Sequence, residues 1–377
     1  MNRHLHSSCY LLMVSVATSF NPYAWYPRQY VVQRVTQPLV IDGDVEKEAW
    51  RNVPWSDAFG DIQGKDGLSP ADIPLTAFKA LYDDKHLYIC AVLHPKDGLP
   101  TEAHSTERNQ PIYQQDSDFE VFIQVGYPNE DGSGTTWNHD YKELEINAIN
   151  TPWNLLMDKP YWDGGQEHSG RVASDPSDPL YYEVYNQETA TRLLSGQLNH
   201  PIHGALWTVE MKLAFSDLWV QKSDTTTNRK PTLSVPWRIN FSRVEKQGSI
   251  NWTWQPQYRW DPRQEQFIGF VDMHLPDAWG YLSFDRPTID RTWPAQLVAM
   301  CIYYAQRHHQ ETYGKFTKDV NALILPPHSM DDFLVDIQLE GSDNYVASII
   351  DANIHVQIRQ DRRLTVVTKR TSVMDQQ

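Results

Sequence analysis

Cysteine is scarce in this sequence, with three among 377 residues. Cys90 and Cys301 remain if an N-terminal targeting segment is removed, and they permit one disulfide or two free thiols. So small a number excludes a disulfide framework and a cysteine-ligated metal cluster. Because Cys90 lies in the strand-like run 87–93, we expect it to be a buried, unreactive thiol.

Basic residues are also in the minority, since 33 Lys and Arg stand against 48 Asp and Glu and give a formal net charge of −15 at pH 7. Such a surface repels polyanions, so we expect no nucleic-acid partner. Neutral ligands or cations fit this charge better. The simplest role of the charge is solubility.

Long apolar runs are missing too. A membrane-spanning helix needs about 20 apolar residues, and no stretch of the chain qualifies. Residues 1–30 combine a weakly basic start, an apolar run over 9–20 and small residues at 17–19, which is typical of a signal peptide and leader. We therefore expect a secreted, extracellular protein without a membrane span. An unstructured N-terminus is the alternative.

Turn formers and aromatic residues are plentiful, with 24 Pro, 18 Gly, 14 Trp, 19 Tyr and 12 Phe. Apolar and polar residues alternate over 119–124, 143–147 and 207–213, the period of a strand with one buried face. Turn-rich segments separate these strands. The pattern predicts a mainly β fold, an antiparallel jelly-roll-like β-sandwich over residues 31–287.

A different pattern begins after residue 287. Four apolar residues recur at helical spacing and predict a helix over 295–313: Leu297, Met300, Cys301 and Tyr304. Strand-like segments follow at 333–339, 354–358 and 363–368. We expect residues 288–377 to form a small unit in which the helix packs on the first two of these strands.

Tryptophan and planar polar side chains are concentrated in 237–245, 251–256 and 274–280, the tryptophan-rich segments. Such mixtures bind sugars because apolar C–H faces stack on indole rings while hydroxyl groups bond to amide, guanidinium and carboxylate groups. The alternative is that these rings fill the core of a β-domain.

Short motifs occur in a fixed order: 41–43 with Trp50 downstream, 81–89, 111–120, 141–147, 207–213 and the tryptophan-rich segments. In this order the chain resembles carbohydrate-binding module family 9 and its relatives over about residues 35–286. The resemblance implies a jelly-roll-like sandwich that binds sugars without turning them over, often at the reducing end of a glucan or xylan chain. Such modules are often attached to glycoside hydrolases.

The resemblance also implies a site in which two aromatic rings hold a saccharide and polar groups fix it: Tyr113, Glu120, Glu145, Asn147, Asn251 and Trp254. Tyr113 stands where a tryptophan is usual, and Glu145 replaces an arginine. Trp153 is a further candidate ring. The alternatives are a solvated strand face for Glu120 and Glu145, a turn residue for Asn147, and a core position for Trp254.

Two other functions fit parts of the sequence. Asp118 and Glu120 share one strand face about 7 Å apart, and paired carboxylates are the machinery of glycoside hydrolases; Asp116 lies nearby. Related sandwiches bind haem, for which five axial ligands are available: His94, His104, His139, His274 and Met273. Met273 and His274 would point to opposite faces of a strand.

Aspartates near the N-terminus are candidate metal ligands. Asp42 and Asp44, with Asp61 and Asp66 downstream, offer oxygen ligands for a structural calcium ion, which the resembled family often carries. The alternative is a pair of ordinary turns. No other cofactor is expected.

Overall fold

The computed structural model describes residues 19–128, 135–222 and 232–368. Residues 1–18, which hold most of the predicted signal peptide, lie outside the described residues. The rest of the predicted leader includes the 3-10 helix η1 (Pro22–Trp25) and the start of strand β1 (Gln29–Arg34). Trp25 stacks on Phe267 with ring centroids 4.3 Å apart, so this segment is packed into the fold. The domain division at residues 30 and 287 stays a prediction.

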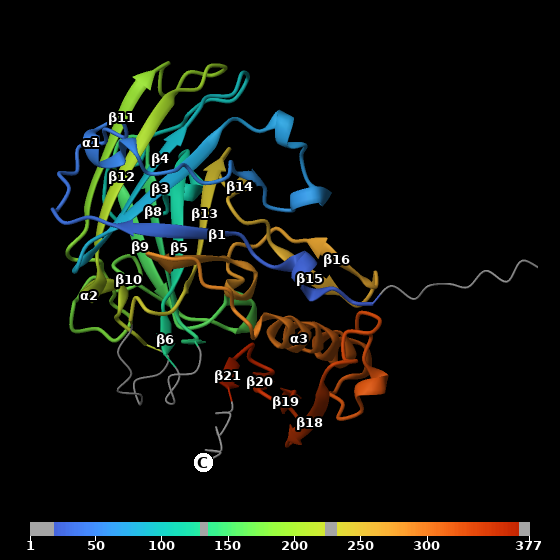
Figure 1. Ribbon diagram of the computed structural model, residues 1–377. Helices are drawn as coiled ribbons and strands as arrows, with labels where there is room; N and C mark the ends of the chain where they lie inside the picture. Colours follow the sequence, from blue (N-terminus) through green and yellow to red (C-terminus); the bar gives the residue numbers. More distant parts are fainter. Residues whose placement is uncertain (1–18, 129–134, 223–231, 369–377) are drawn as a thin grey trace, which may run out of the picture.

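One large sheet of thirteen strands dominates the molecule, and its main path runs β10-β9-β8-β5-β13-β17-β1-β3-β4-β12-β11 (Figure 1). Its strands are β1, β2 (Gly60–Asp61), β3 (Thr76–Tyr82), β4 (His86–Leu93), β5 (Asp118–Gln124), β8 (Tyr141–Asn147), β9 (Pro152–Met157), β10 (Glu167–Ser169), β11 (Glu188–Ser195), β12 (Leu206–Ala214), β13 (Trp237–Glu245), β14 (Ile250–Thr253) and β17 (Gly280–Phe284). β14 pairs with β13 and with β2 at the side of this path.

Strand β1 joins the two halves of the sheet, because it pairs with β17 on one side and with β3 on the other. Both pairings are parallel, while the other pairings of the large sheet are antiparallel among the described strands. The mainly β prediction is confirmed. The purely antiparallel sandwich is corrected to one curled, mixed sheet, because strand alternation determines which face is buried and not which strand is the partner.

The two halves of the curled sheet bury a common core. Phe119, Val121 and Ile123 of β5 belong to the same buried cluster as Trp207 and Val209 of β12. These residues are the apolar members of the predicted alternations, so the inward face was predicted correctly. Because successive side chains on a strand point to opposite faces, the intervening residues of β5 must lie on the outside of the sheet.

Short elements connect and cover the large sheet. The helices are α1 (Glu48–Arg51), α2 (Phe215–Leu218), η2 (Gly64–Asp66), η3 (Pro70–Asp72), η4 (Ile112–Gln114), η5 (Tyr161–Asp163) and η6 (Pro276–Ala278). Two hairpins stand apart from the sheet: β6 (Gly126–Pro128) with β7 (Thr135–Trp137), and β15 (Tyr258–Asp261) with β16 (Gln266–Gly269).

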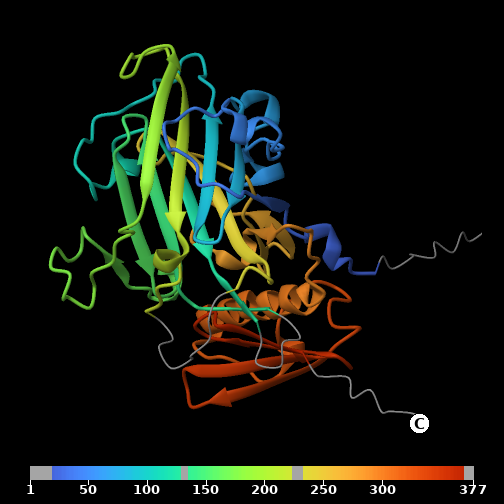
Figure 2. The same cartoon turned by 60° about the vertical axis from the view of Figure 1, so that its left-hand side comes forward.

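The C-terminal part contains a long helix, a 3-10 turn and an antiparallel four-stranded sheet: α3 (Trp293–Tyr313), η7 (Val320–Ala322), β18 (Leu334–Glu340), β19 (Asn344–Ile350), β20 (Ile354–Arg359) and β21 (Leu364–Thr368). The helix and three of the strands were predicted. Figure 2 shows α3 lying between the large sheet and the small one.

Helix α3 is buried on every side along its first four turns, because the small sheet covers one side and the β15–β16 hairpin with η1 covers another. The four residues of the predicted apolar stripe are all buried. The predicted partner strand is wrong in one case: α3 packs on β19 and β20, whereas β18 is an edge strand with mostly exposed side chains. The sequence analysis missed β19, whose inward residues include the small Ala347.

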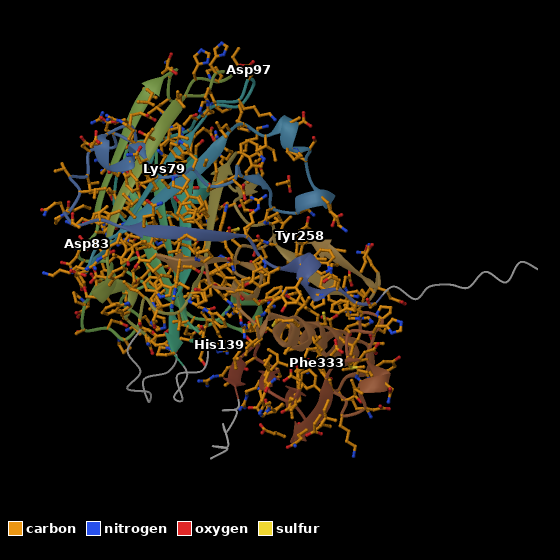
Figure 3. The ribbon with its side chains drawn as sticks, in the orientation of Figure 1. Lys79, Asp83, Asp97, His139, Tyr258 and Phe333 are labelled. Atoms are coloured by element: carbon orange, nitrogen blue, oxygen red, sulfur yellow. The ribbon has the colours of Figure 1, made fainter. Side chains whose placement is uncertain are left out.

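Arg362, in the turn between β20 and β21, fastens the small sheet to the large one. Its guanidinium donates to Asp163 (2.9 Å), to Asp277 (2.9 Å) and to the hydroxyl of Tyr304 on α3 (2.9 Å). Figure 3 labels His139 at this junction, where it lines a small hollow together with Arg362.

Both predicted cysteine thiols are buried and free. Burial raises the pKa of each thiol above its usual range, as expected for unreactive cysteines. Among the described helices, none has the length and apolar character needed to cross a membrane.

Candidate functional site

The outer face of one half of the sheet carries a row of carboxylates. Glu120 of β5 lies directly opposite Glu145 of β8, and Phe122 lies opposite Glu143. Asp118 lies two residues before Glu120 and shares its face. We refer to Asp118, Glu120, Glu143 and Glu145 as the carboxylate cluster. It follows from the alternation that buries Phe119 and Val121 on the inner side.

A hollow of about 340 Å³ opens over this face, and we call it the acidic pocket. The residues that line it are Ile62, Tyr113, Glu120, Phe122, Glu143, Glu145, Trp153, Leu155, Tyr161, Arg171, Val244, Gly248, Asn251, Val271, Asp272, Met273 and His274. Its size and its combination of apolar and polar walls fit a small ligand.

Aromatic rings form part of the pocket wall. Tyr113 and Trp153 stack with centroids 5.7 Å apart and an interplanar angle of 14°. The guanidinium of Arg171 lies 4.8 Å from the Trp153 ring centroid, so the indole already has two stacking partners. Tyr161 is 44% exposed and meets the edge of His274. Tyr113 and Tyr161 therefore offer the ring surface that a ligand can reach.

The carboxylate cluster is buried although it borders the pocket. Burial raises the pKa of Glu120 to about 8. Burial, and after it repulsion from the neighbouring carboxylates, also raises the pKa values of Asp118, Glu143 and Glu145 well above the usual range. A group with a raised pKa holds its proton more tightly than an exposed carboxyl does.

Cationic side chains near the pocket are bound elsewhere. Arg171 forms an ion pair with Glu167. Nδ1 of His274 lies 2.8 Å from the hydroxyl of Tyr141 and 3.9 Å from a carboxylate oxygen of Glu143. Burial lowers the pKa of His274, so at neutral pH it is an uncharged hydrogen-bond partner. Arg171 and His274 therefore form no ion pair with Asp118, Glu120 or Glu145.

Of the six predicted site residues, the structure brings four together in the acidic pocket: Tyr113, Glu120, Glu145 and Asn251. Asn251 sits on β14 opposite Val244, and its side-chain amide donates to the carbonyl of Gly248 (3.1 Å). Its carbonyl oxygen is the group that it can offer to a ligand.

Asn147 is not part of the pocket. It is fully buried at the end of β8, where its amide donates to the carbonyl of Ser105 (2.9 Å) and to Asp116 (2.7 Å), while its carbonyl oxygen accepts from the backbone of Thr151 (2.8 Å). The expectation that Asn147 reaches a ligand is corrected to the alternative, a residue that satisfies backbone groups at a turn.

Trp254 is not part of the pocket either. It is 1% exposed and packs edge to face against Phe78 (5.3 Å) and Phe241 (6.1 Å) in the core between the two halves of the sheet. The ring therefore lies on the opposite side of the sheet from the acidic pocket. The predicted stack of a sugar between Tyr113 and Trp254 is corrected, because Trp252 and Trp254 share the inward parity of their strand.

The tryptophan in the pocket wall is Trp153, whereas Trp254 was the expected one. It was noted as a further candidate ring, and it lies directly opposite Glu145 across the β8–β9 ladder. Tyr161 and Arg171 were not predicted, because no local pattern in the sequence shows that these two residues of η5 and the segment after β10 fold over the sheet.

The predicted calcium motif is made of ordinary turns. Asp42 bonds to Lys47 (2.9 Å) and Arg192 (3.0 Å), and Asp44 pairs with Arg192 (3.4 Å). Asp61 and Asp66 accept backbone N–H groups elsewhere. The structure supports the interpretation of this motif as ordinary turns, because Lys and Arg side chains already pair with its first two carboxylates.

The haem alternative finds little support in the pocket. Met273 and His274 lie in a loop, and both line the acidic pocket, so the expectation that they point to opposite faces is corrected. Nδ1 of His274 is engaged with Tyr141. His139 lines a different hollow, beside the C-terminal sheet, and His104 is exposed.

The fold is a mainly β domain built on one curled, mixed sheet, and the acidic pocket opens on the outer face of that sheet. Residues 41–159 match the family model described as carbohydrate family 9 binding domain-like. Over these residues the chain is similar to family 9-like carbohydrate-binding domains, and the resemblance recognised from the sequence motifs is confirmed there.

Three solved structures are similar to the chain. A putative carbohydrate-binding protein from Bacteroides uniformis has 12% identity and a TM-score of 0.44, covering 69% of this chain and 100% of that one. A family 9 module from Caldicellulosiruptor kristjanssonii in complex with cellotriose has 17% identity and a TM-score of 0.36, with 70% and 97% covered. The same organism's module in complex with glucose has 16% identity and a TM-score of 0.36, with 69% and 97% covered. No curated protein matches the chain.

Proposed function

We propose that the protein binds a saccharide in the acidic pocket and does not turn it over. One observation carries this proposal: Tyr113, Glu120, Glu145 and Trp153, which line the pocket, all lie within the residues that match the carbohydrate-binding family. Eight of the seventeen lining residues lie in the matched part of the chain, and the others, Tyr161 and Asn251 among them, come from segments that follow it.

The aromatic rings of the pocket fit a sugar that stacks on one ring face, not a sugar enclosed between two parallel rings. A sugar held between two rings needs about 7–8 Å, two carbon–carbon contact distances, while Tyr113 and Trp153 are 5.7 Å apart. The ligand therefore stacks on the accessible faces of Tyr113 and Tyr161. Its hydroxyl groups hydrogen-bond to Glu120, Glu145 and Asn251 at the floor.

A platform of this kind supports moderate affinity. Each stacked ring contributes on the order of 1 kcal/mol beyond area burial, and part of the polar gain is lost to desolvation. We expect dissociation constants in the micromolar range. Secretion and a role in polysaccharide binding or breakdown belong to the proposal and follow from the N-terminal segment and the family.

Isothermal titration calorimetry tests the proposal, after a glycan screen that includes cellotriose and glucose. Replacing Tyr113 by Ala removes one platform and is expected to weaken binding by about 1–3 kcal/mol. Tyr185→Ala is the matched control, because Tyr185 is 66% exposed and lies outside the pocket. A folded Tyr113→Ala protein with unchanged affinity would show that the pocket is not the saccharide site.

A glycoside hydrolase is the alternative. Oxygen atoms of Glu120 and Glu145 approach within 4.8 Å, near the about 5–5.5 Å between the carboxyl groups of retaining enzymes. Steady release of reducing sugars that stops in Glu120→Gln would establish the hydrolase instead.

A further inference from the structure

The strongest unexplained feature of the molecule is the cluster of buried carboxyl groups beneath the acidic pocket. Asp118, Glu120 and Glu145 come from two neighbouring strands, and each offers a carboxylate oxygen within 4.8 Å of the others. Glu120 and Glu145 are a direct cross-strand pair. Two ionised carboxylates directly opposite each other destabilise a sheet, so either bound protons or a bound cation must offset this arrangement.

The protein supplies little compensation itself. Neither carboxylate oxygen of Asp118 nor of Glu145 receives a hydrogen bond from any described residue, although these oxygens are buried. No lysine, arginine or histidine among the described residues forms an ion pair with Asp118, Glu120 or Glu145. An unpaired buried charge costs several kcal/mol.

A fourth carboxylate, Glu143, lines the same pocket beside this cluster. Glu143 is almost fully buried, lines the acidic pocket, and has an oxygen, Oε2, without a hydrogen-bond partner among the described residues. Its histidine neighbour, His274, is hydrogen-bonded to Tyr141. Three acidic side chains thus converge on one buried spot with Glu143 next to them, and Asp118, Glu143 and Glu145 each have an oxygen without a hydrogen-bond partner among the described residues.

The geometry fits a hard divalent cation. Calcium takes oxygen ligands at about 2.3–2.6 Å, so two oxygens on opposite sides of one ion are about 4.6–5.2 Å apart, and oxygens on adjacent sides are closer. A separation of at most 4.8 Å falls in that range. The donor set is all oxygen, which favours calcium, magnesium or manganese over zinc or copper.

We propose that Asp118, Glu120 and Glu145 bind a divalent cation, best matched by Ca²⁺, beneath the floor of the acidic pocket, with Glu143 beside it. Asp118 lies below the floor, whereas Glu120 and Glu145 line the pocket. This site does not depend on saccharide binding.

Calcium binding to the chelator-treated full chain is the direct test, measured by calorimetry and by terbium luminescence excited through Trp153 and Tyr113. We expect one saturable site and a rise in melting temperature on adding calcium. Asp118→Asn and Glu145→Gln keep the shape of the side chain and should weaken calcium binding by more than about tenfold, which is 1.4 kcal/mol.

Asp42→Asn with Asp44→Asn is the matched control, because these carboxylates already pair with Lys47 and Arg192. It should leave the affinity for calcium unchanged. The melting temperature of each variant in chelator reports whether it folds. Calcium affinity that is equal in the wild type, Asp118→Asn and Glu145→Gln would overturn the proposal.

A second result would also overturn it. If the chain binds no calcium, magnesium or manganese but prefers glucosamine oligomers to cello-oligomers, the cluster serves an ammonium group of the saccharide. Absence of saccharide binding with calcium binding intact would refute the proposed function and leave the cation site standing.

Discussion

Tyr113 and Trp254 were expected to face one another across a sugar, yet the sheet separates them. Tyr113 borders the acidic pocket, while Trp254 is enclosed by Phe78 and Phe241. The parity of a strand assigns each side chain to a face. It does not show which face carries a ligand, and that information came from the loops that fold over β8 and β9.

Gly280 provides a test of the core role of Trp254. A Cβ atom on Gly280 would lie 2.3 Å from Cζ3 of the Trp254 ring, so Gly280→Ala overpacks the core. We expect it to lower the free energy of unfolding by about 1–3 kcal/mol and to leave saccharide affinity unchanged. Urea denaturation measures the first quantity and calorimetry the second.

Gly60→Ala is the control for that substitution, because nothing lies within 4 Å of the Cβ position there. If Gly280→Ala lowers saccharide affinity and leaves the free energy of unfolding unchanged, Trp254 contributes to saccharide binding and not to the core.

Glu183 gives a pH-dependent prediction. It is almost buried, which raises its pKa, but hydrogen bonds from Arg108, Asn109 and Asn154 outweigh burial and lower the pKa overall. A lowered pKa in the folded state means that the carboxylate stabilises the fold above the unfolded pKa of about 4.3 and that this stabilisation is lost as the pH falls through the folded pKa. We expect Glu183→Gln to cost about 1–3 kcal/mol at pH 7.

Chemical denaturation at pH 7 and at pH 3 measures this effect, and the difference between wild type and Glu183→Gln should shrink at the lower pH. Glu188→Gln is the control. The Glu188 carboxylate is exposed and pairs with Lys212, and exposed ion pairs contribute at most about 1 kcal/mol to the free energy of unfolding. An equal cost at both pH values would contradict the prediction.

Among the elements, strands with regular alternation were predicted well and their partners were not. The apolar positions of β5, β8 and β12 and the stripe of α3 were all read correctly from the sequence. The parallel pairing of β1 was missed because its partners β3 and β17 lie far away along the chain. The contact of α3 with β19 was missed for a different reason, since Ala347 weakens the apolar pattern of that strand.

Arg362 carries the prediction for the junction of the elements. Arg362→Met removes a buried cation from Asp163 and Asp277, and breaking a buried pair from one side costs about 3–5 kcal/mol. Arg263→Met is the control, because the Arg263–Glu311 pair is exposed and is expected to contribute at most about 1 kcal/mol. Urea denaturation measures the free energy of unfolding of both variants. Equal values for Arg362→Met and Arg263→Met would contradict the role of Arg362.

For the molecule as a whole, α3 makes the two parts interdependent. One face of the helix packs on Trp260 and Phe267 of the β15–β16 hairpin, and another packs on β19 and β20. The two parts therefore share one apolar cluster.

We expect the full chain to melt in a single calorimetric transition, because neither part can open without exposing that cluster. A chain that ends at residue 287 should associate or precipitate through the uncovered apolar surface. Two separate transitions, together with a monomeric and stable truncated chain, would contradict this interdependence.

The position of β1 has a consequence for the order of folding. β1 is made early in synthesis, but one of its two neighbours, β17, is made only after the rest of the large sheet. The halves of the sheet cannot be joined until that late strand is available. Contacts between such distant segments are slow to form because a long loop must close first. We therefore expect a late, slow step in refolding, during which the edges that β1 later covers remain open to other chains.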